Sequence, residues 1–160
     1  MAGSVTGAGL ELGGPAPDFT LRDQFGQDVT LSSFAGRKAV VILFYPYAFS
    51  GVCTGELAGV RDRLDEFLTF DTEVLAISCD PVYSLRAFAD AEGLNFPLLS
   101  DFWPHGEVSS RYEVFDEVKG RPRRSSYVVD LDGNLRWAVH NANPEGRDLD
   151  EHLVQLGKVV

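Results

Sequence analysis

Residues 44–57 read FYPYAFSGVCTGEL, and the rest of the chain is organised around them. An apolar, β-rich run that begins at Ala39 leads into this stretch and ends at Pro46. A helical pattern then starts at about Cys53, because apolar residues recur from there at helical spacing: Leu57, Val60, Leu64 and Phe67. This order predicts a core strand that is followed, after a short loop, by a helix over residues 53–68.

Cys53 falls in the first turn of the predicted helix. The free backbone N–H groups and the positive end of the helix dipole favour an anion there. A thiol in such surroundings can have its pKa lowered from ~8.5 to roughly 3.5–7.5. Because the thiolate is the nucleophilic form, Cys53 is a candidate for covalent chemistry. The alternative is an inert cysteine packed under the start of the helix.

Length and composition indicate one packed domain. The chain has 160 residues, of which 44% are hydrophobic, and carries a formal net charge of −10. Such an acidic surface argues against nucleic acid and anionic membranes as partners. No apolar run approaches the ~20 residues that a membrane span needs. Two cysteines are too few for a disulfide framework, so we expect a reducing, cytoplasmic location.

The first 14 residues contain five glycines and no basic residue. This composition predicts a flexible N-terminal extension over residues 1–14 rather than a secretory signal. A single domain is expected over residues 15–160.

The remaining pattern is that of an α/β domain with one mixed sheet. Two short strands around Gly26 predict an N-terminal hairpin, and Asp132-Gly133 marks a second hairpin near the C-terminus. The other expected strands cover residues 74–78 and 96–99, and the other expected helices cover residues 84–92, 108–112 and 149–160.

Cys53 does not fit three common cysteine chemistries. A zinc site needs about four ligands at metal spacing, and none is formed by the cysteines and histidines of the chain: Cys53, Cys79, His105, His140 and His152. A Cys-x₅-Arg phosphate loop would need arginine where Gly59 stands. A dithiol oxidoreductase needs Cys-x-x-Cys, whereas Ser50 occupies the first position here. The pattern therefore indicates a lone nucleophile with a hydroxyl neighbour.

Pro46, Ser50 and Cys53 match Pro-x-x-x-(Thr/Ser)-x-x-Cys, the active-site motif of peroxiredoxins. Further blocks at residues 16–26, 98–106 and 124–130 resemble other segments of that family and occur in the same order. The chain thus resembles peroxiredoxins of the AhpC/TSA family, most closely the AhpE-type one-cysteine class. The resemblance implies a thioredoxin-like fold, with a central mixed β-sheet flanked by helices and an N-terminal β-hairpin.

The resemblance also implies roles for the site residues. The Cys53 thiolate would attack a peroxide and become a sulfenic acid. Ser50 would hydrogen-bond the thiolate and the attacked oxygen, and Arg124 would hold the developing negative charge. Pro46 would shield the sulfenic acid, and Glu56 would orient Arg124.

Each role has a structural alternative. Ser50 could be a helix cap, Pro46 a strand terminator and Glu56 a partner of the helix dipole. Arg124 could be a solvated edge-strand charge, and its neighbour Arg123 could be the site arginine instead.

The expected activity is thiol-dependent reduction of hydrogen peroxide and organic hydroperoxides, with peroxynitrite as a further candidate substrate. Position 58, where one subclass has a resolving cysteine, is Ala58. Only Cys79 remains, so the sequence favours a one-cysteine cycle. The reductant would be a low-molecular-weight thiol with a glutaredoxin-like protein, or thioredoxin. A two-cysteine cycle through Cys79 and a low-turnover redox sensor are the alternatives.

The resemblance further implies a homodimer or larger homo-oligomer. Four aromatic residues near the motif could lie at such an interface or form a substrate collar: Tyr47, Phe49, Phe102 and Trp103. No metal or organic cofactor is implied.

Overall fold

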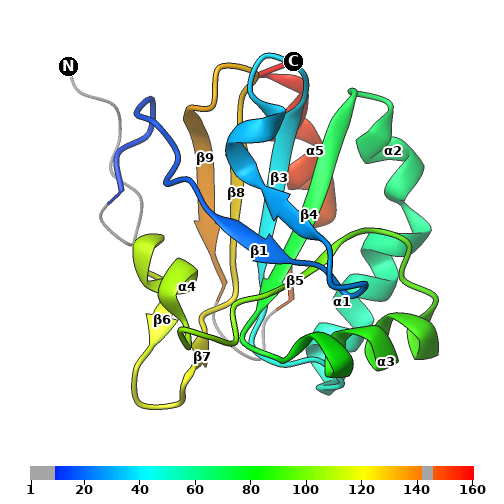
Figure 1. Ribbon diagram of the computed structural model, residues 1–160. Coiled ribbons are helices and arrows are strands. Elements are labelled where there is room, and N and C mark those ends of the chain that lie inside the picture. The colour runs from blue at the N-terminus through cyan, green and yellow to red at the C-terminus, as the bar shows by residue number, and fades with distance from the viewer. Residues whose placement is uncertain (1–9, 142–145) are drawn as a thin grey trace.

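A seven-stranded mixed sheet forms the centre of the computed structural model, which describes residues 10–141 and 146–160. The strand order is β2-β1-β5-β4-β3-β8-β9. Figure 1 shows helices on both sides of this sheet. The strands are β1 (Thr20–Arg22), β2 (Asp28–Thr30), β3 (Ala39–Phe44), β4 (Thr72–Ser78), β5 (Leu98–Ser100), β8 (Ser125–Val129) and β9 (Leu135–His140).

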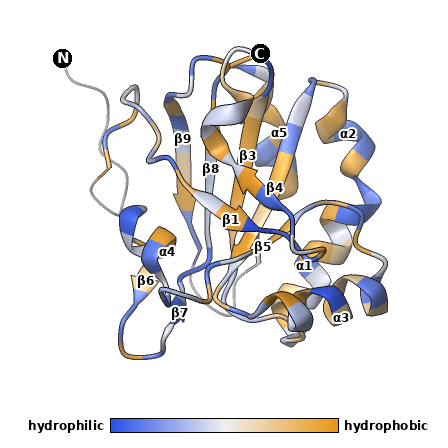
Figure 2. Cartoon of the chain, viewed as in Figure 1, coloured by the Kyte–Doolittle hydropathy of each residue, from blue (hydrophilic) through white to orange (hydrophobic). Residues whose placement is uncertain are grey.

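Strand β3 lies in the interior of the sheet, between β4 and β8, and all six of its residues are apolar and buried. It pairs in parallel with β4 and antiparallel with β8, so both of its edges and both of its faces are covered. Val41 and Leu43 pack on one face, whereas Ile42 and Phe44 pack on the other. Figure 2 shows the corresponding apolar colour along β3 and β4.

The two faces carry different elements. The face with Val41 is covered by α1 (Gly51–Asp62), α2 (Leu64–Leu68), α3 (Val82–Glu92) and α5 (Leu149–Gly157). The face with Ile42 is covered by α4 (Glu107–Arg111) and the 3₁₀ turn η1 (Leu31–Phe34). Cys53 belongs to the first of these two cores.

The single helix predicted over residues 53–68 is two helices. The backbone leaves α-helical geometry at Arg63, with φ −111° and ψ 14°, between α1 and α2. The Arg63 side chain bonds Glu66 and Asp150 at this break. Because the apolar positions continue through the break, periodicity alone did not reveal it.

Both predicted hairpins are present. β1 pairs antiparallel with β2, and β8 pairs antiparallel with β9. Gly133 adopts φ +84° in the second turn, where the Asp130 carboxylate accepts two backbone N–H groups, from Asp132 and Asn134. A further small hairpin, β6 (Phe115–Asp116) with β7 (Arg121–Pro122), was not predicted.

The predicted N-terminal extension lies partly outside the described residues, which begin at Leu10. Its described end pairs with the sheet: the backbone N–H of Gly13 donates to Leu135 O, and Gly14 O accepts from Leu135. Leu10 and Leu12 pack against the core on the α4 face. Of the helices in the described ranges, none combines the length and the apolar character needed to cross a membrane.

Candidate active site

The loop of residues 45–50 carries the chain from β3 to α1 and holds the start of the helix in place. Pro46 is buried at the end of β3. The Ala48 backbone N–H donates to the Asp80 carboxylate, which follows β4, at 2.8 Å. Phe49 adopts φ +67°, an unfavourable conformation for a residue with a side chain, and its ring packs on Phe88 at 5.0 Å. These contacts keep a strained backbone directly before α1.

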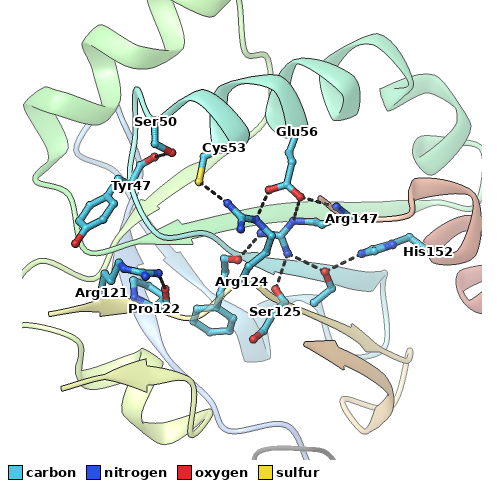
Figure 3. Close-up of polar contacts among 12 residues, drawn as sticks. Tyr47, Ser50, Cys53, Glu56, Arg121, Pro122, Arg124, Ser125, Arg147 and His152 are labelled. Carbon is cyan, nitrogen blue, oxygen red and sulfur yellow. Dashed lines mark hydrogen bonds and ion pairs between the residues drawn. The ribbon is translucent and has the colours of Figure 1, made fainter. Parts of the chain in front are cut away.

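Cys53 lies in the first turn of α1 and is fully buried. Its amide is among the first four N–H groups of the helix, which have no partner within the helix. Nη2 of Arg124, the residue before β8, donates to Cys53 Sγ at 3.2 Å (Figure 3). The thiol therefore meets a guanidinium and a helix N-terminus together, two features that stabilise the thiolate form.

Glu56, one turn further along α1, connects two arginines. One carboxylate oxygen accepts from Arg124 Nε at 2.7 Å. The other accepts from the backbone N–H of Arg147 at 2.6 Å and forms an ion pair with Arg147 Nε at 3.5 Å. All three side chains are at least 93% buried. Glu56 thus bonds the same arginine that contacts Cys53.

Arg147 is the site residue that sequence reasoning missed. It stands in a polar segment before α5 that has the composition of a surface loop, and no periodic pattern marks it. In the structure its Nη1 donates to Ser125 O at 2.7 Å and to Ser126 Oγ at 2.8 Å, and its Nη2 donates to Phe44 O. The guanidinium therefore ties the ends of β3 and β8 to Glu56.

Burial lowers the pKa of Arg147 to about 10, although Glu56 opposes this shift. For Arg124, burial would lower the pKa, but the Glu56 carboxylate and Cys53 raise it above its ordinary value. Both guanidinium groups are consequently charged at neutral pH.

Among the described residues, the charges around Cys53 come from two arginines and one glutamate. Arg124 and Arg147 contribute two positive charges, and Glu56 contributes one negative charge. Buried charges are costly unless they are paired. A thiolate at Cys53 would place a further negative charge against the Arg124 guanidinium.

Two other predicted site residues have different contacts. Within the described part of the chain, Ser50 Oγ donates to Tyr47 O at 3.1 Å and bonds neither Cys53 nor a helix N–H group. Arg123 is exposed and donates to Phe115 O. Arg124, and not Arg123, is therefore the arginine that faces Cys53.

Cys79 does not share the site of Cys53. It follows β4, in which Val74 and Ala76 pack on the face of Cys53 whereas Leu75 and Ile77 pack on the opposite face. Continued alternation places Cys79 with Leu75 and Ile77. There burial, reinforced by the Asp101 carboxylate, raises the pKa of the Cys79 thiol to about 12. Both cysteines are free thiols.

Comparison with known proteins agrees with this architecture. The AhpC/TSA family matches residues 12–138. Alkyl hydroperoxide reductase E of Mycobacterium tuberculosis is 49% identical over 139 residues, which cover 87% of this chain and 91% of the relative. The crystal structure of Enterococcus faecalis AhpC has a TM-score of 0.84 at 27% identity, covering 92% of this chain and 90% of that one.

A second solved structure, peroxidoxin BcpB from Mycobacterium tuberculosis, has a TM-score of 0.83 at 30% identity, covering 93% of this chain and 97% of its own. These matches confirm the thioredoxin-like fold and the resemblance that the motif indicated. The chain therefore belongs to the AhpC/TSA family and is a peroxiredoxin, a thiol peroxidase.

Proposed function

We propose that Cys53 is the peroxidatic cysteine and that the chain reduces hydrogen peroxide and organic hydroperoxides, with peroxynitrite as a further substrate. The observation that carries this proposal is the 3.2 Å contact between Arg124 Nη2 and Cys53 Sγ, inside a buried cluster that also contains Glu56 and Arg147. This arrangement stabilises a thiolate, and the thiolate is the form of cysteine that attacks peroxides.

In the proposed reaction, the Cys53 thiolate attacks the terminal oxygen of a hydroperoxide, ROOH. A sulfur–oxygen bond forms and the peroxide O–O bond breaks, so sulfur is oxidised and the peroxide is reduced. The attacked oxygen keeps its hydrogen and yields Cys53–SOH, while RO⁻ leaves and takes a proton from water to become ROH. Arg124 is placed to hold the negative charge that moves toward the leaving oxygen. Ser50 could bond the thiolate or the attacked oxygen only after its hydroxyl turns away from Tyr47 O.

Mass spectrometry tests this assignment directly. One equivalent of hydrogen peroxide is added to the reduced protein with a sulfenic-acid trap present, and the adduct is located by peptide masses. We expect the adduct on Cys53 and none in Cys53→Ser. An adduct on Cys79 alone, or fast peroxide consumption by Cys53→Ser, would refute the assignment. Formation of the adduct without turnover in the presence of any thiol reductant would favour the sensor alternative.

We further propose a one-cysteine cycle, in which an external thiol attacks the sulfenic acid, releases water and forms a mixed disulfide that a second thiol reduces. The reductant would be a low-molecular-weight thiol with a glutaredoxin-like protein, or thioredoxin. The placement of Cys79 on the other face of the sheet from Cys53 supports this cycle.

Cys79→Ser is therefore expected to leave the rate constant for Cys53 oxidation within about twofold of wild type, because a thiol with a pKa near 12 forms almost no nucleophile at neutral pH. Stopped-flow kinetics with hydrogen peroxide measures this constant. Intact mass after one equivalent of peroxide provides the second readout. A loss of two hydrogens that maps to a Cys53–Cys79 bridge would contradict the one-cysteine cycle.

We also propose that the chain forms a homodimer through an aromatic face. Four exposed aromatic side chains line a cavity of about 870 Å³ between β1, β2, the start of α3 and the loop after β5: Phe25, Tyr83, Phe102 and Trp103. Trp103 is 81% exposed and Tyr83 is 89% exposed in the single chain. Exposed large apolar side chains that lie together, rather than singly, are typical of interaction surfaces.

Trp103→Lys is expected to shift the protein from dimer to monomer at micromolar concentration, because a charge would be buried at the centre of the interface. Light scattering after size exclusion gives the mass. Val154→Lys, which places the same charge at an exposed apolar residue of α5, serves as the control. Equal masses for the two variants would argue against this face as the interface.

A further inference from the structure

Ser126 and His152 form a buried extension of the charge cluster, behind Arg147. Ser126 Oγ lies 2.8 Å from Arg147 Nη1 and 2.7 Å from His152 Nε2. His152 Nδ1 lies 2.6 Å from Asp148 O at the start of α5. The His152 ring also meets the edge of Trp137 at 4.9 Å. His152 and Ser126 are each no more than 1% exposed.

The proton positions in this chain follow from the partners. A backbone carbonyl only accepts, so His152 Nδ1 must carry the proton that it gives to Asp148 O. The Arg147 guanidinium only donates, so Ser126 Oγ must accept from it. Neutral His152 then has a free lone pair on Nε2, which accepts the Ser126 hydroxyl proton. Every bond is satisfied in this one arrangement.

We propose that Ser126 and His152 are positioning residues for the peroxide reaction: neutral His152 accepts a hydrogen bond from the Ser126 hydroxyl, and Ser126 thereby presents a lone pair that holds Arg147 against Glu56. Glu56 in turn holds Arg124 on Cys53. The proposal rests on the proposed role of Cys53. Under this proposal, His152 of α5 helps to support a thiolate at Cys53, at the start of α1.

Protonation of His152 would break this arrangement. Its Nε2 would become a donor, so Ser126 Oγ would receive two donors and its own proton would need a new acceptor. The charged groups that face His152 are Arg147 and Asp148 before α5 and Glu56 on α1, and a positive imidazole would repel Arg147. Burial lowers the pKa of His152 from its ordinary value, which keeps it neutral at neutral pH.

A neighbouring serine–histidine pair provides a matched control. Ser125 precedes Ser126 on β8, and its hydroxyl points to the other face of the sheet, where it bonds His140 Nδ1 at 2.8 Å. His140 is exposed, and its partner Ser125 meets Arg147 only through the backbone carbonyl, which accepts from Arg147 Nη1 at 2.7 Å. His140→Phe therefore removes an equivalent serine–histidine bond but leaves that carbonyl contact and the side-chain partners of Arg147 in place.

The experiment compares His152→Phe with His140→Phe, and Ser126→Ala with Ser126→Thr, all in a Cys79→Ser background. Two quantities are measured: the rate constant for reaction with hydrogen peroxide, and the thiolate fraction of Cys53 from its ultraviolet absorbance as a function of pH. We expect His152→Phe and Ser126→Ala to lower the rate constant at neutral pH by about three- to tenfold, the effect of one lost buried hydrogen bond. His140→Phe and the hydroxyl-retaining Ser126→Thr should stay within about twofold of the background.

The pH dependence separates positioning from general loosening of the fold. In the background protein, the thiolate fraction should fall more steeply on acidification than in His152→Phe. Protonation of His152 would weaken the support for Arg124, and this would promote protonation of Cys53. Equal rate constants for His152→Phe and His140→Phe, or parallel pH profiles for His152→Phe and the background, would overturn the proposal. If Cys53 were inert toward peroxide, the proposed function would fail, yet the thiolate titration would still test the positioning role.

Discussion

Arg124→Leu is expected to slow the reaction of Cys53 with hydrogen peroxide by about two to three orders of magnitude, the usual effect of removing a preorganised donor from a developing negative charge. The substitution removes the Nη2 donor that lies 3.2 Å from Cys53 Sγ. It also removes one positive charge beside Cys53, which leaves a thiolate there less well stabilised. Both effects lower the rate constant of Cys53 with hydrogen peroxide.

Stopped-flow kinetics at neutral pH measures the effect, and the neighbouring residue gives the control. Arg123→Leu removes the same charge from the adjacent, exposed position and should leave the rate constant unchanged within about twofold. Arg124→Lys should recover only part of the activity, because an ammonium group cannot bond Glu56 and Cys53 with the planar fork of a guanidinium. Similar rate constants for Arg124→Leu and Arg123→Leu would show that Arg124 has no part in the reaction.

Glu56→Gln is expected to reduce the free energy of unfolding by about 3–5 kcal/mol, because it leaves two buried guanidinium groups without their carboxylate. Glutamine has the same shape but no charge, and its N–H₂ group would face the Arg147 backbone N–H or Arg124 Nε, which are themselves donors. Such a loss is a large part of the ~5–15 kcal/mol that stabilises a typical domain.

Urea unfolding followed by circular dichroism measures this loss. Glu66→Gln is the matched control, because Glu66 also bonds an arginine, Arg63, but does so at the surface, where its side chain is 52% exposed. That variant should unfold at the wild-type urea concentration. Equal midpoints for Glu56→Gln and Glu66→Gln would contradict the structural importance of the buried cluster.

The sequence was most informative where local pattern and chemistry coincide. The apolar run of β3, the start of a helix after it and the two hairpins are each defined by a short stretch of sequence, and the structure confirms them. The contacts of Cys53 with Arg124 and of Arg124 with Glu56 were also expected, because the resemblance to peroxiredoxins implies them. Composition and spacing alone would not have joined Arg124 to a cysteine so far away in the sequence.

Other features depend on contacts between distant segments. Arg147 is buried only because the segment before α5 returns to the ends of β3 and β8, and nothing in its own neighbourhood distinguishes it from a surface arginine. Arg63, at the break between α1 and α2, bonds Asp150 of α5, a contact that local sequence does not reveal. The position of Cys79, in contrast, could have been predicted from the sequence. Side chains alternate between the two faces of a strand, so Cys79 lies on the opposite face of the sheet from Val74 and Ala76.

The charges around Cys53 also have a consequence for the product of the proposed reaction. A sulfenic acid is neutral, so oxidation of a Cys53 thiolate would remove the negative charge that lies against Arg124. The buried guanidinium would then lose one anionic contact, which carries an electrostatic cost. That cost would favour the approach of a new anion, and the thiolate of a reductant is one. The same arginine would thus favour both the first oxidation and the arrival of the thiol that reverses it.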